Sequence, residues 1–360
     1  MRSVFSMLAL GVAWFATVHS GIADDNIMTE RVFGPEIPGK YKHPASITQL
    51  QNGDLYLVYY GGGGEYSDDS TVRGARRRKD ESRWSMPKTI QPRPKFPEGN
   101  AVVWQAPDGV VWLFSVTRHG DTWSTSRIVA RTSTDGAETW TEPVELTTEA
   151  GTMVRGRPIV LADGDYLLPI YHETGHDTER VGADTTSLFL RYNVKQKRWT
   201  ESNRITSRLG NLQPAVVALN ARDLICYCRR GADYAPRTDG YLVRSESHDG
   251  GRTWSHGVDS RFPNPNAAVD FLRLANGHLL LVYNDSMNHR TPLTAAISTD
   301  NDKTYPHKRN LAEGSGDFGY PYVIQTRDGK IHAIYTSHRR SVINHAVFEE
   351  SAILGSAGKP

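Results

Sequence analysis

The dominant pattern in this sequence is a pair of short runs of alternating apolar and polar residues on either side of a tight polar turn. The first pair covers residues 45–50 and 55–60, and Asn52-Gly53 lies between them. Alternation with a period of two is typical of a half-buried β-strand, and Asn-Gly between two such runs predicts a β-hairpin. We expect a type I′ turn there, with positive φ at both central residues.

The hairpin pattern recurs six times along the chain. Neighbouring turns lie 52 to 57 residues apart. The turn positions are Gly53, Gly109, Gly164, Ala221, Gly277 and Gly329. An Asn or Asp precedes each of them, and few long helical patterns interrupt the series. Repetition at a fixed period indicates a repeat architecture in which each repeat is one supersecondary unit.

A second motif recurs in phase with the hairpins. The pattern Ser-x-Asp-Gly-x-x-Thr-Trp occurs at 133–140 and 247–254, a degenerate copy ends at Tyr305, and Trp84 and Trp199 hold the equivalent place in two further repeats. The chain accommodates six repeats of about 55 residues. Small sheets repeated around an axis bury their faces against their neighbours. The sequence therefore predicts an all-β fold, a six-bladed β-propeller, in preference to a seven-bladed or solenoid arrangement.

The charges of the chain are nearly balanced. Lys and Arg number 42 and Asp and Glu number 40, which gives a formal net charge of +2. Neither sign has the surplus that binding to a polyanion requires, so we expect no nucleic-acid partner. Hydrophobic residues make up 38% of the chain, which is enough for a folded core.

The first 23 residues have the pattern of a secretory signal peptide. Arg2 precedes an apolar run over 4–18, and small residues lead to Ala23. The run is shorter than the roughly 20 apolar residues that span a bilayer, which favours a removed signal over an uncleaved anchor. We therefore expect a secreted or periplasmic monomer without membrane contact after cleavage, in which residues 24–360 form a single propeller domain.

Polar residues are concentrated at one end of the predicted axis. The first strand of each repeat begins, and the antiparallel second strand ends, on the same face of a propeller. The starts of the first strands hold Lys42, His43, Asn100, Arg155, Arg157, Gln213, Asn266, Asp270 and Tyr320. The ends of the second strands hold the 65–69 loop, Arg118, His119, His172, Glu173, Arg229, Arg230, Asn284, Asp285, Arg339 and Arg340. Each side chain alone is explained as a solvated polar group, but their convergence predicts a site at this mouth.

Short phrases near the predicted mouth carry a family resemblance. They are Gly99-Asn100, Arg157-Pro158, Gln213-Pro214, Asn264-Pro265-Asn266, Tyr320-Pro321 and Arg339-Arg340. With the Ser-x-Asp-Gly-x-x-Thr-Trp motif, they make residues 40–350 resemble a sialidase (neuraminidase) of the Asp-box or BNR-repeat propeller family, in particular its bacterial sialidase-like branch. The resemblance implies Asp-box turns between the third and fourth strands. It also implies an exported exo-glycosidase, without a metal or cofactor, that removes a terminal acidic sugar such as sialic acid from a glycan.

The resemblance implies a tyrosine nucleophile, which is an exception among glycosidases. A phenol has a pKa near 10 and needs activation. The glutamate that usually provides it is expected where this chain has Gln213, which cannot accept a proton. Either another group such as Glu173 is the base, or the substrate is not an ordinary sialoside. The implied catalytic residues are Tyr320, Asp68 or Asp69 as acid/base, Glu65 as their rival, and Glu173.

The resemblance also implies three arginines that bind the carboxylate of the sugar, because charged guanidinium pairs are strong and directional. Arg290 corresponds to the third, and Arg229 or Arg230 to the second. Lys42 stands where the first is expected, and it keeps the charge but lacks the bidentate fork. The expected substrate-binding residues are Lys42, His43, Asn100, Arg157, Gln213, Arg229, Arg230, Arg290 and Arg339.

Three alternatives remain at this point. The first is a propeller with the same rim that binds carbohydrate without turnover, and the second is an enzyme that acts on uronic-acid glycans. The third is a zinc protease, because residues 172–176 spell His-Glu-x-x-His. That motif places two ligands on one face only in a helix, whereas this segment follows a strand pattern, so we expect no metal site.

Overall fold

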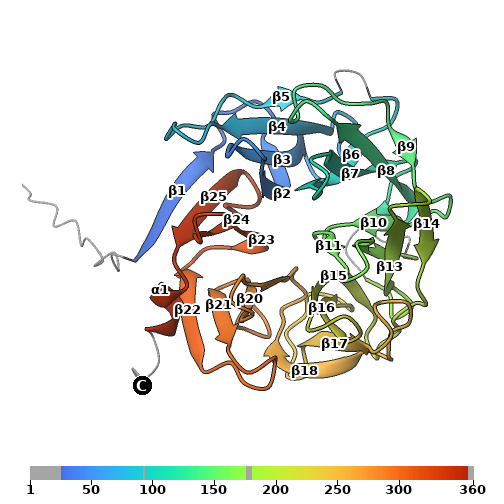
Figure 1. The fold of residues 1–360 in the computed structure, drawn as a ribbon, viewed down its shortest axis with the longest axis vertical. Helices are drawn as coiled ribbons and strands as arrows, with labels where there is room; N and C mark the ends of the chain where they lie inside the picture. Colours follow the sequence, from blue (N-terminus) through green and yellow to red (C-terminus); the bar gives the residue numbers. More distant parts are fainter. Residues whose placement is uncertain (1–25, 92–93, 176–180, 356–360) are drawn as a thin grey trace, which may run out of the picture.

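The computed structural model describes residues 26–91, 94–175 and 181–355. Six antiparallel sheets surround a central axis, and the colours of Figure 1 show them following one another around the ring in chain order. Each hairpin expected from the sequence forms the two inner strands of one sheet. The all-β, six-bladed propeller is therefore confirmed. The expected signal peptide, 1–23, lies outside the described residues.

Five blades are each continuous in sequence. The first blade contains β2 (Tyr41–Gln49), β3 (Leu55–Gly62), β4 (Thr71–Arg77) and β5 (Lys88–Thr89). The second contains β6 (Glu98–Gln105), β7 (Val111–Arg118), η1 (Trp123–Thr125), β8 (Ser126–Ser133) and β9 (Val144–Glu145). The third contains β10 (Thr152–Val154), β11 (Ile159–Val160), β12 (Tyr166–His172), β13 (Thr186–Asn193) and β14 (Arg198–Glu201). The fourth contains β15 (Asn211–Ala218), β16 (Leu224–Arg230), β17 (Tyr241–Ser247) and β18 (Val258–Pro263). The fifth contains β19 (Asp270–Arg273), β20 (Leu279–Asn284), β21 (Leu293–Ser298) and β22 (His307–Ala312).

The sixth blade closes the ring with a strand from the other end of the chain. It contains β23 (Gly319–Gln325), β24 (Ile331–Ser337) and β25 (Val342–Phe348), followed by the short helix α1 (Ser351–Leu354). Its outer strand is β1 (Ile27–Phe33), which pairs antiparallel with β25 (Figure 1). Glu30 of β1 accepts hydrogen bonds from His345 and Arg77, both at 2.9 Å. The sequence did not predict this strand, because its partner lies about 315 residues away.

The hairpin turns differ from the type expected. Gly53 N–H donates to Leu50 and Leu50 N–H donates to Asp54, so three residues form the loop. Positive φ occurs at Gly53 (96°) but not at Asn52. This is a type I turn followed by one left-handed glycine, the usual three-residue hairpin, and the prediction of a type I′ turn is wrong. The other four glycine turns also have positive φ at the glycine alone.

The repeated Ser-x-Asp motif forms the turn between the third and fourth strands. The Asp249 carboxylate accepts hydrogen bonds from the backbone N–H groups of Arg252 and Thr253, both at 2.9 Å, and from the Thr253 hydroxyl at 2.6 Å. Trp254 then stacks on Phe189 of the preceding blade, with ring centroids 4.2 Å apart. The aspartate thus fixes the turn, and the aromatic residue joins neighbouring blades.

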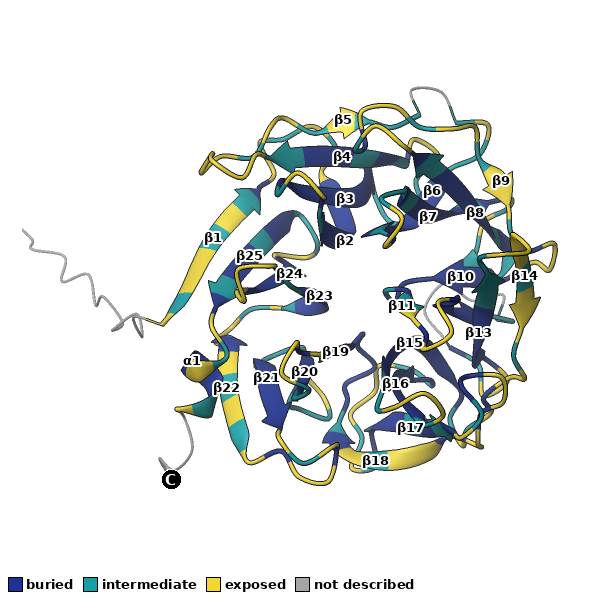
Figure 2. Ribbon diagram, viewed as in Figure 1, coloured by how far each residue is buried: buried dark blue, intermediate teal, exposed yellow. Residues whose placement is uncertain are grey.

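Burial follows the distance from the axis. In Figure 2 the inner strands are dark blue and the outer strands carry the exposed positions. In four blades the first strand shifts register against the second strand near its own start. These first strands are β2, β6, β15 and β23. Asn100, Gln213, Asn266 and Tyr320, at or just before the first strands of their blades, have φ between 36° and 58°. Non-glycine residues rarely adopt such φ values, and strain of this kind is concentrated at functional sites.

Candidate active site

One pocket opens where the first strands begin and the second strands end, the face on which the sequence places its polar residues. The expected site residues that line it are His43, Glu65, Asn100, Glu173, Gln213, Arg229 and Tyr320. They come from five of the six blades. The propeller geometry therefore brings together side chains that are up to 277 positions apart in the sequence.

Tyr320 lies in the pocket among guanidinium groups. Arg229 Nη1 donates a hydrogen bond to the Tyr320 hydroxyl oxygen at 2.9 Å. Four guanidinium carbons lie 5.4 to 6.0 Å from the centroid of its ring, those of Arg155, Arg229, Arg290 and Arg340. The side chain is only 5% exposed, so water screens these charges weakly.

This environment favours the ionised phenol. Burial raises the pKa of Tyr320, but the positive charges of Arg229, Arg290 and Arg340 outweigh burial, and the pKa lies below its ordinary value. A phenol with a lowered pKa is a better nucleophile at neutral pH, because more of it is ionised. The positive charges thus activate the Tyr320 phenol, which Gln213 cannot do because it is not a base.

Arg229 is held by four side chains. It donates to the Asn266 side-chain oxygen at 2.6 Å, to Gln213 Oε1 at 3.2 Å and to the Tyr234 hydroxyl at 2.9 Å, in addition to Tyr320. Gln213 in turn donates from Nε2 to the Tyr171 hydroxyl at 3.4 Å. A glutamine can accept from one neighbour and donate to the other, which explains why an amide fits this position.

Two carboxyl groups line the pocket. Glu65 forms an ion pair with Arg340, which also donates to the Tyr41 hydroxyl at 3.1 Å. Burial inside the pocket raises the pKa of Glu173 to about 7, against the opposing charge of Arg229. About half of Glu173 is therefore protonated at neutral pH, which suits a group that must give a proton in one step and take one in the next.

The two aspartates expected as the acid/base lie outside the pocket. Asp68 is exposed and pairs with Arg118 at 3.3 Å. Asp69 accepts hydrogen bonds from Gly63 N–H at 2.9 Å and from the Ser67 hydroxyl at 2.6 Å, which fixes the loop that follows β3. Glu65, three residues before Asp68, is the carboxylate of this loop that lines the pocket.

His43 lies against the edge of the Tyr320 ring, with centroids 3.9 Å apart. Its Nδ1 is 3.0 Å from the Thr336 hydroxyl, which donates its own proton to the Gly319 carbonyl. The hydroxyl therefore accepts from Nδ1–H, and the lone pair is on Nε2. Burial and the nearby arginines lower the pKa of His43 well below its usual range, so the imidazole is neutral.

The lysine expected as the first carboxylate ligand points elsewhere. Lys42 Nζ donates to the carbonyl groups of Ile37 at 3.0 Å and Gly39 at 2.6 Å. Arg340 lies beside Tyr320 instead, whereas Arg339 is exposed. His338, Arg339 and Arg340 all have positive φ, between 52° and 65°. Strand alternation does not apply to such a turn, so the sequence could not show which of the two arginines faces inward.

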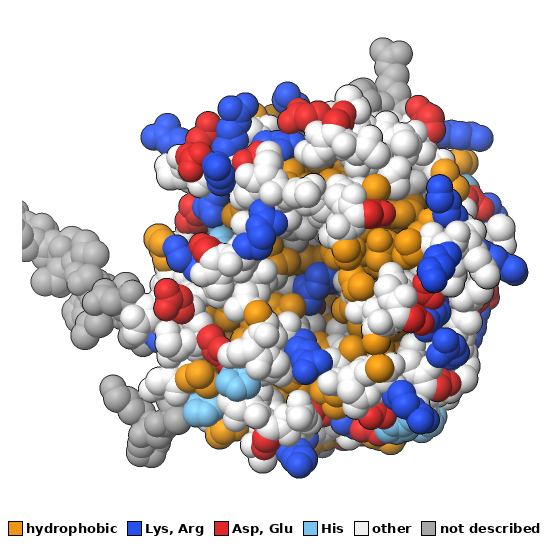
Figure 3. Space-filling view, in the orientation of Figure 1, with side chains coloured by type: hydrophobic (Ala, Val, Ile, Leu, Met, Phe, Trp, Pro, Cys, Tyr) orange, Lys and Arg blue, Asp and Glu red, His pale blue; other side chains and the backbone are white. Residues whose placement is uncertain are grey.

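Two other expected arginines hold the backbone. Arg157 donates to the Phe271 carbonyl at 3.3 Å and lies 3.6 Å from Asp270, across the central channel. Figure 3 shows a hollow at the centre of the ring, with basic side-chain atoms visible inside it. Arg230 donates to the carbonyl groups of Asn264 at 2.8 Å and Gly231 at 2.8 Å, whereas its neighbour Arg229 faces the pocket.

Several pocket residues were not identified from the sequence. Tyr171 precedes His172 at the end of β12. The sequence analysis expects the ends of the second strands at the mouth, so the same reasoning could have found Tyr171. Tyr234 and Trp123 lie in connections between strands and carry no periodic signal. Among residues 26–91, 94–175 and 181–355, no group of three or more His, Cys, Asp and Glu side chains could hold a metal. His176 of the His-Glu-x-x-His segment is outside these ranges.

Solved structures with this fold include glycosidases. The Hadza microbial sialidase Hz136 superposes with a TM-score of 0.75 at 17% identity, over 91% of this chain and 69% of that one. The NanB sialidase of Streptococcus pneumoniae gives 0.72 at 10% identity, over 90% and 71%. The α-L-arabinanase of Penicillium chrysogenum gives 0.66 at 14% identity, over 89% and 97%. At these identities the likeness establishes the fold alone.

No curated protein matches the sequence. A family model for the BNR repeat-like domain matches residues 53–333, which covers most of the six blades. The Asp-box turns, the six sheets and this match agree with one another. The chain therefore belongs to the BNR repeat-like domain family, the sialidase-like propellers.

Proposed function

We propose that this protein is an exo-glycosidase that removes a terminal acidic sugar from a glycan, with sialic acid as the first candidate. The observation that carries the proposal is the position of Tyr320, whose hydroxyl oxygen is 2.9 Å from Arg229 within a ring of guanidinium groups. This arrangement supports a phenolate nucleophile and a negatively charged substrate at the same place.

The surroundings of Tyr320 favour an anion, because cationic groups outnumber anionic ones there. Arg229, Arg290 and Arg340 surround Tyr320, while Glu65 already neutralises one of them and Glu173, with a pKa of about 7, is only partly ionised at neutral pH. A substrate carboxylate would restore the balance through charge-assisted hydrogen bonds.

The proposed reaction proceeds in two steps. The Tyr320 phenolate attacks the anomeric carbon and the bond from that carbon to the leaving oxygen breaks, while the Glu173 carboxyl group gives its proton to that oxygen. A water molecule then attacks the anomeric carbon, gives its proton to the Glu173 carboxylate and releases the phenolate. Two displacements retain the anomeric configuration.

A uronic-acid glycan is the second candidate substrate. Lys42 is turned away from the pocket and Gln213 replaces the expected glutamate, and both features depart from the sialidase pattern. A carboxylate clamp made of Arg229, Arg290 and Arg340 is compatible with the carboxylate of a uronic acid as well.

A panel of fluorogenic glycosides tests the proposal. Purified protein should release the fluorophore from the sialoside, or else from a glucuronide or galacturonide, and leave neutral glycosides intact. The Tyr320→Phe variant should lose this activity, and Arg339→Met, which alters an exposed arginine, should keep it. Binding of acidic sugars without turnover would instead support a carbohydrate-binding propeller.

We also propose that the protein is exported, on the basis of the signal pattern in residues 1–23. Within the described ranges, no helix is long and apolar enough to cross a membrane. Expression of the full chain followed by N-terminal sequencing of the secreted or periplasmic fraction tests this, and a mature N-terminus near residue 24 is expected.

A further inference from the structure

A second cavity lies beside the pocket that holds Tyr320. The inner pocket has a volume of about 50 Å³ and the outer cavity about 450 Å³. Tyr234 lines both, so its side chain forms the wall between them. The inner volume holds only the end of a glycan, so a ligand whose acidic end reaches Tyr320 continues past Tyr234 toward the outer cavity.

Tyr234 has the position of an aromatic platform. The residue is 44% exposed, yet its hydroxyl accepts a hydrogen bond from Arg229 at 2.9 Å. The Arg290 guanidinium lies 5.7 Å from the Tyr234 ring and 5.4 Å from the Tyr320 ring. Arg229 and Arg290, two of the four guanidinium groups around Tyr320, therefore also contact Tyr234; Arg229 lines the inner pocket and Arg290 lines the outer cavity.

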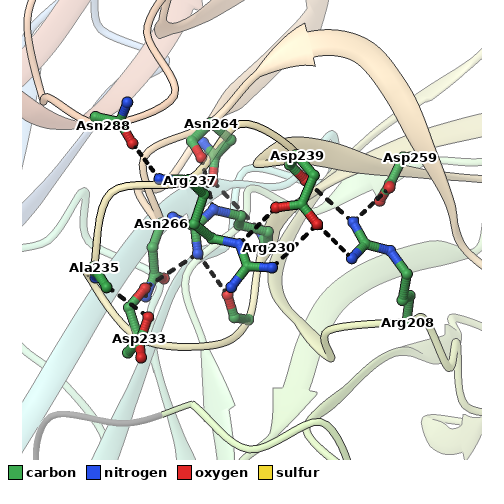
Figure 4. Close-up of polar contacts among 11 residues, drawn as sticks. Arg208, Arg230, Asp233, Ala235, Arg237, Asp239, Asp259, Asn264, Asn266 and Asn288 are labelled. Carbon is green, nitrogen blue, oxygen red and sulfur yellow. Dashed lines mark hydrogen bonds and ion pairs between the residues drawn. The ribbon is translucent and has the colours of Figure 1, made fainter.

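Ionic contacts and hydrogen bonds fix the loop that carries Tyr234. Figure 4 shows Arg237 and Asp239 of this loop close to Arg208 and Asp259. Arg237 donates to Asp239 at 2.9 Å, and Arg208 donates to both Asp239 and Asp259 at 2.8 Å. The buried Arg230 donates a hydrogen bond to the Asp233 carbonyl oxygen at 3.1 Å. A platform held in this way loses little conformational entropy when a ligand stacks on it.

The lining of the outer cavity fits a neutral sugar. Amide, hydroxyl and imidazole groups provide both donors and acceptors, as the hydroxyl groups of a sugar require. These groups belong to Asn288, His289, Thr291 and Ser315. Arg290 and Asp317 both line the cavity, and their opposite charges leave it without a net attraction to a second acidic sugar.

We propose that the outer cavity is the subsite for the neutral sugar to which the terminal acidic sugar is linked, and that Tyr234 is the stacking surface that the leaving sugar uses. The inference rests on the proposed function for the direction of the glycan, because the acidic end must occupy the inner pocket. With such a subsite, specificity depends on the identity of the second sugar as well as on that of the terminal acidic sugar.

Filling the outer cavity tests the proposal. Ser315→Trp introduces a bulky side chain at the cavity, at an exposed residue away from Tyr320, and Thr134→Trp makes the same change on the opposite, Asp-box face. For an acidic sugar linked to lactose, Ser315→Trp should lower kcat/KM at least about tenfold, which is the factor for 1.4 kcal/mol of lost binding. A glycosyl fluoride of the same acidic sugar has no second sugar, so Ser315→Trp should leave its rate unchanged, and Thr134→Trp should affect neither substrate.

A binding measurement separates this inference from the proposed function. Saturation-transfer NMR with lactose, maltose and cellobiose should detect contact of at least one disaccharide with the wild-type protein and loss of contact in Ser315→Trp. Tyr234→Ala should weaken the contact and Tyr234→Phe should retain it, because the ring is kept. If no acidic glycoside is cleaved but this binding pattern is found, the subsite stands and the proposed reaction is wrong. Absence of disaccharide contact, or equal effects of Ser315→Trp on the fluoride and the lactoside, would overturn the subsite.

Discussion

The pKa of Tyr320 should depend on the charge of Arg290, which Arg290→Met removes while it keeps most of the side-chain volume. The guanidinium carbon lies 5.4 Å from the ring centroid, and the arginine is half-buried. For effective dielectric constants between about 20 and about 80, a unit charge at this distance contributes about 1 to 3 kcal/mol, or about 1 to 2 pKa units. Loss of the charge therefore raises the pKa of Tyr320 by that amount and lowers the fraction of phenolate at neutral pH.

The assay is an NMR titration of protein labelled with carbon-13 at the tyrosine ring carbon that bears the oxygen, in which the Tyr320→Phe variant identifies the signal. Arg339→Met is the matched control, because Arg339 is exposed while its neighbour Arg340 faces the tyrosine. The pKa should rise in Arg290→Met and remain at the wild-type value in Arg339→Met. An unchanged pKa in Arg290→Met, or an equal shift in both variants, would refute the electrostatic account of the pocket.

Two further results are expected. Turnover should fall as pH rises through about 7, because Glu173 loses the proton that the leaving oxygen needs. Glu173→Gln should be inactive on substrates with poor leaving groups. A pH profile without this fall would show that Glu173 is not the acid. Asp249→Ala should lower the free energy of unfolding by about 2–4 kcal/mol, because it deletes several hydrogen bonds to a carboxylate, and the exposed neighbour His248→Ala should change it little when both are measured by chemical denaturation.

The fold could be predicted from the sequence because its signals are local and repeated. Each turn glycine and each Asp-box aspartate acts on residues within a few positions, as the contacts of Asp249 with Arg252 and Thr253 show. The closing strand β1 could not be predicted, because it pairs with β25 from the opposite end of the chain. The predicted turn type was wrong because Asn-Gly is compatible with two hairpin geometries. The length of the loop decides between them, and three residues form the loop here.

The site could be predicted as a region but not residue by residue. In a propeller the first strands begin and the second strands end on the same face. The sequence therefore placed Tyr320, Gln213 and Glu173 on one face, and all three line the pocket. The direction of each side chain depends on bulges and positive φ at those strand ends, as with Arg340 and its neighbour. Regular strand alternation does not hold through such distortions, so the alternation of residues in the sequence cannot show which side chain faces the pocket.

The central claim is that Tyr320 is the nucleophile, and trapping of the intermediate tests it most directly. An acidic glycosyl fluoride with a second fluorine next to the anomeric carbon forms the covalent intermediate faster than water releases it. After incubation with the protein, protease digestion and mass spectrometry should place the sugar on the peptide that contains Tyr320, with no label in Tyr320→Phe. Label on Glu65 or Glu173, or an unlabelled protein that still turns over acidic glycosides, would contradict the account.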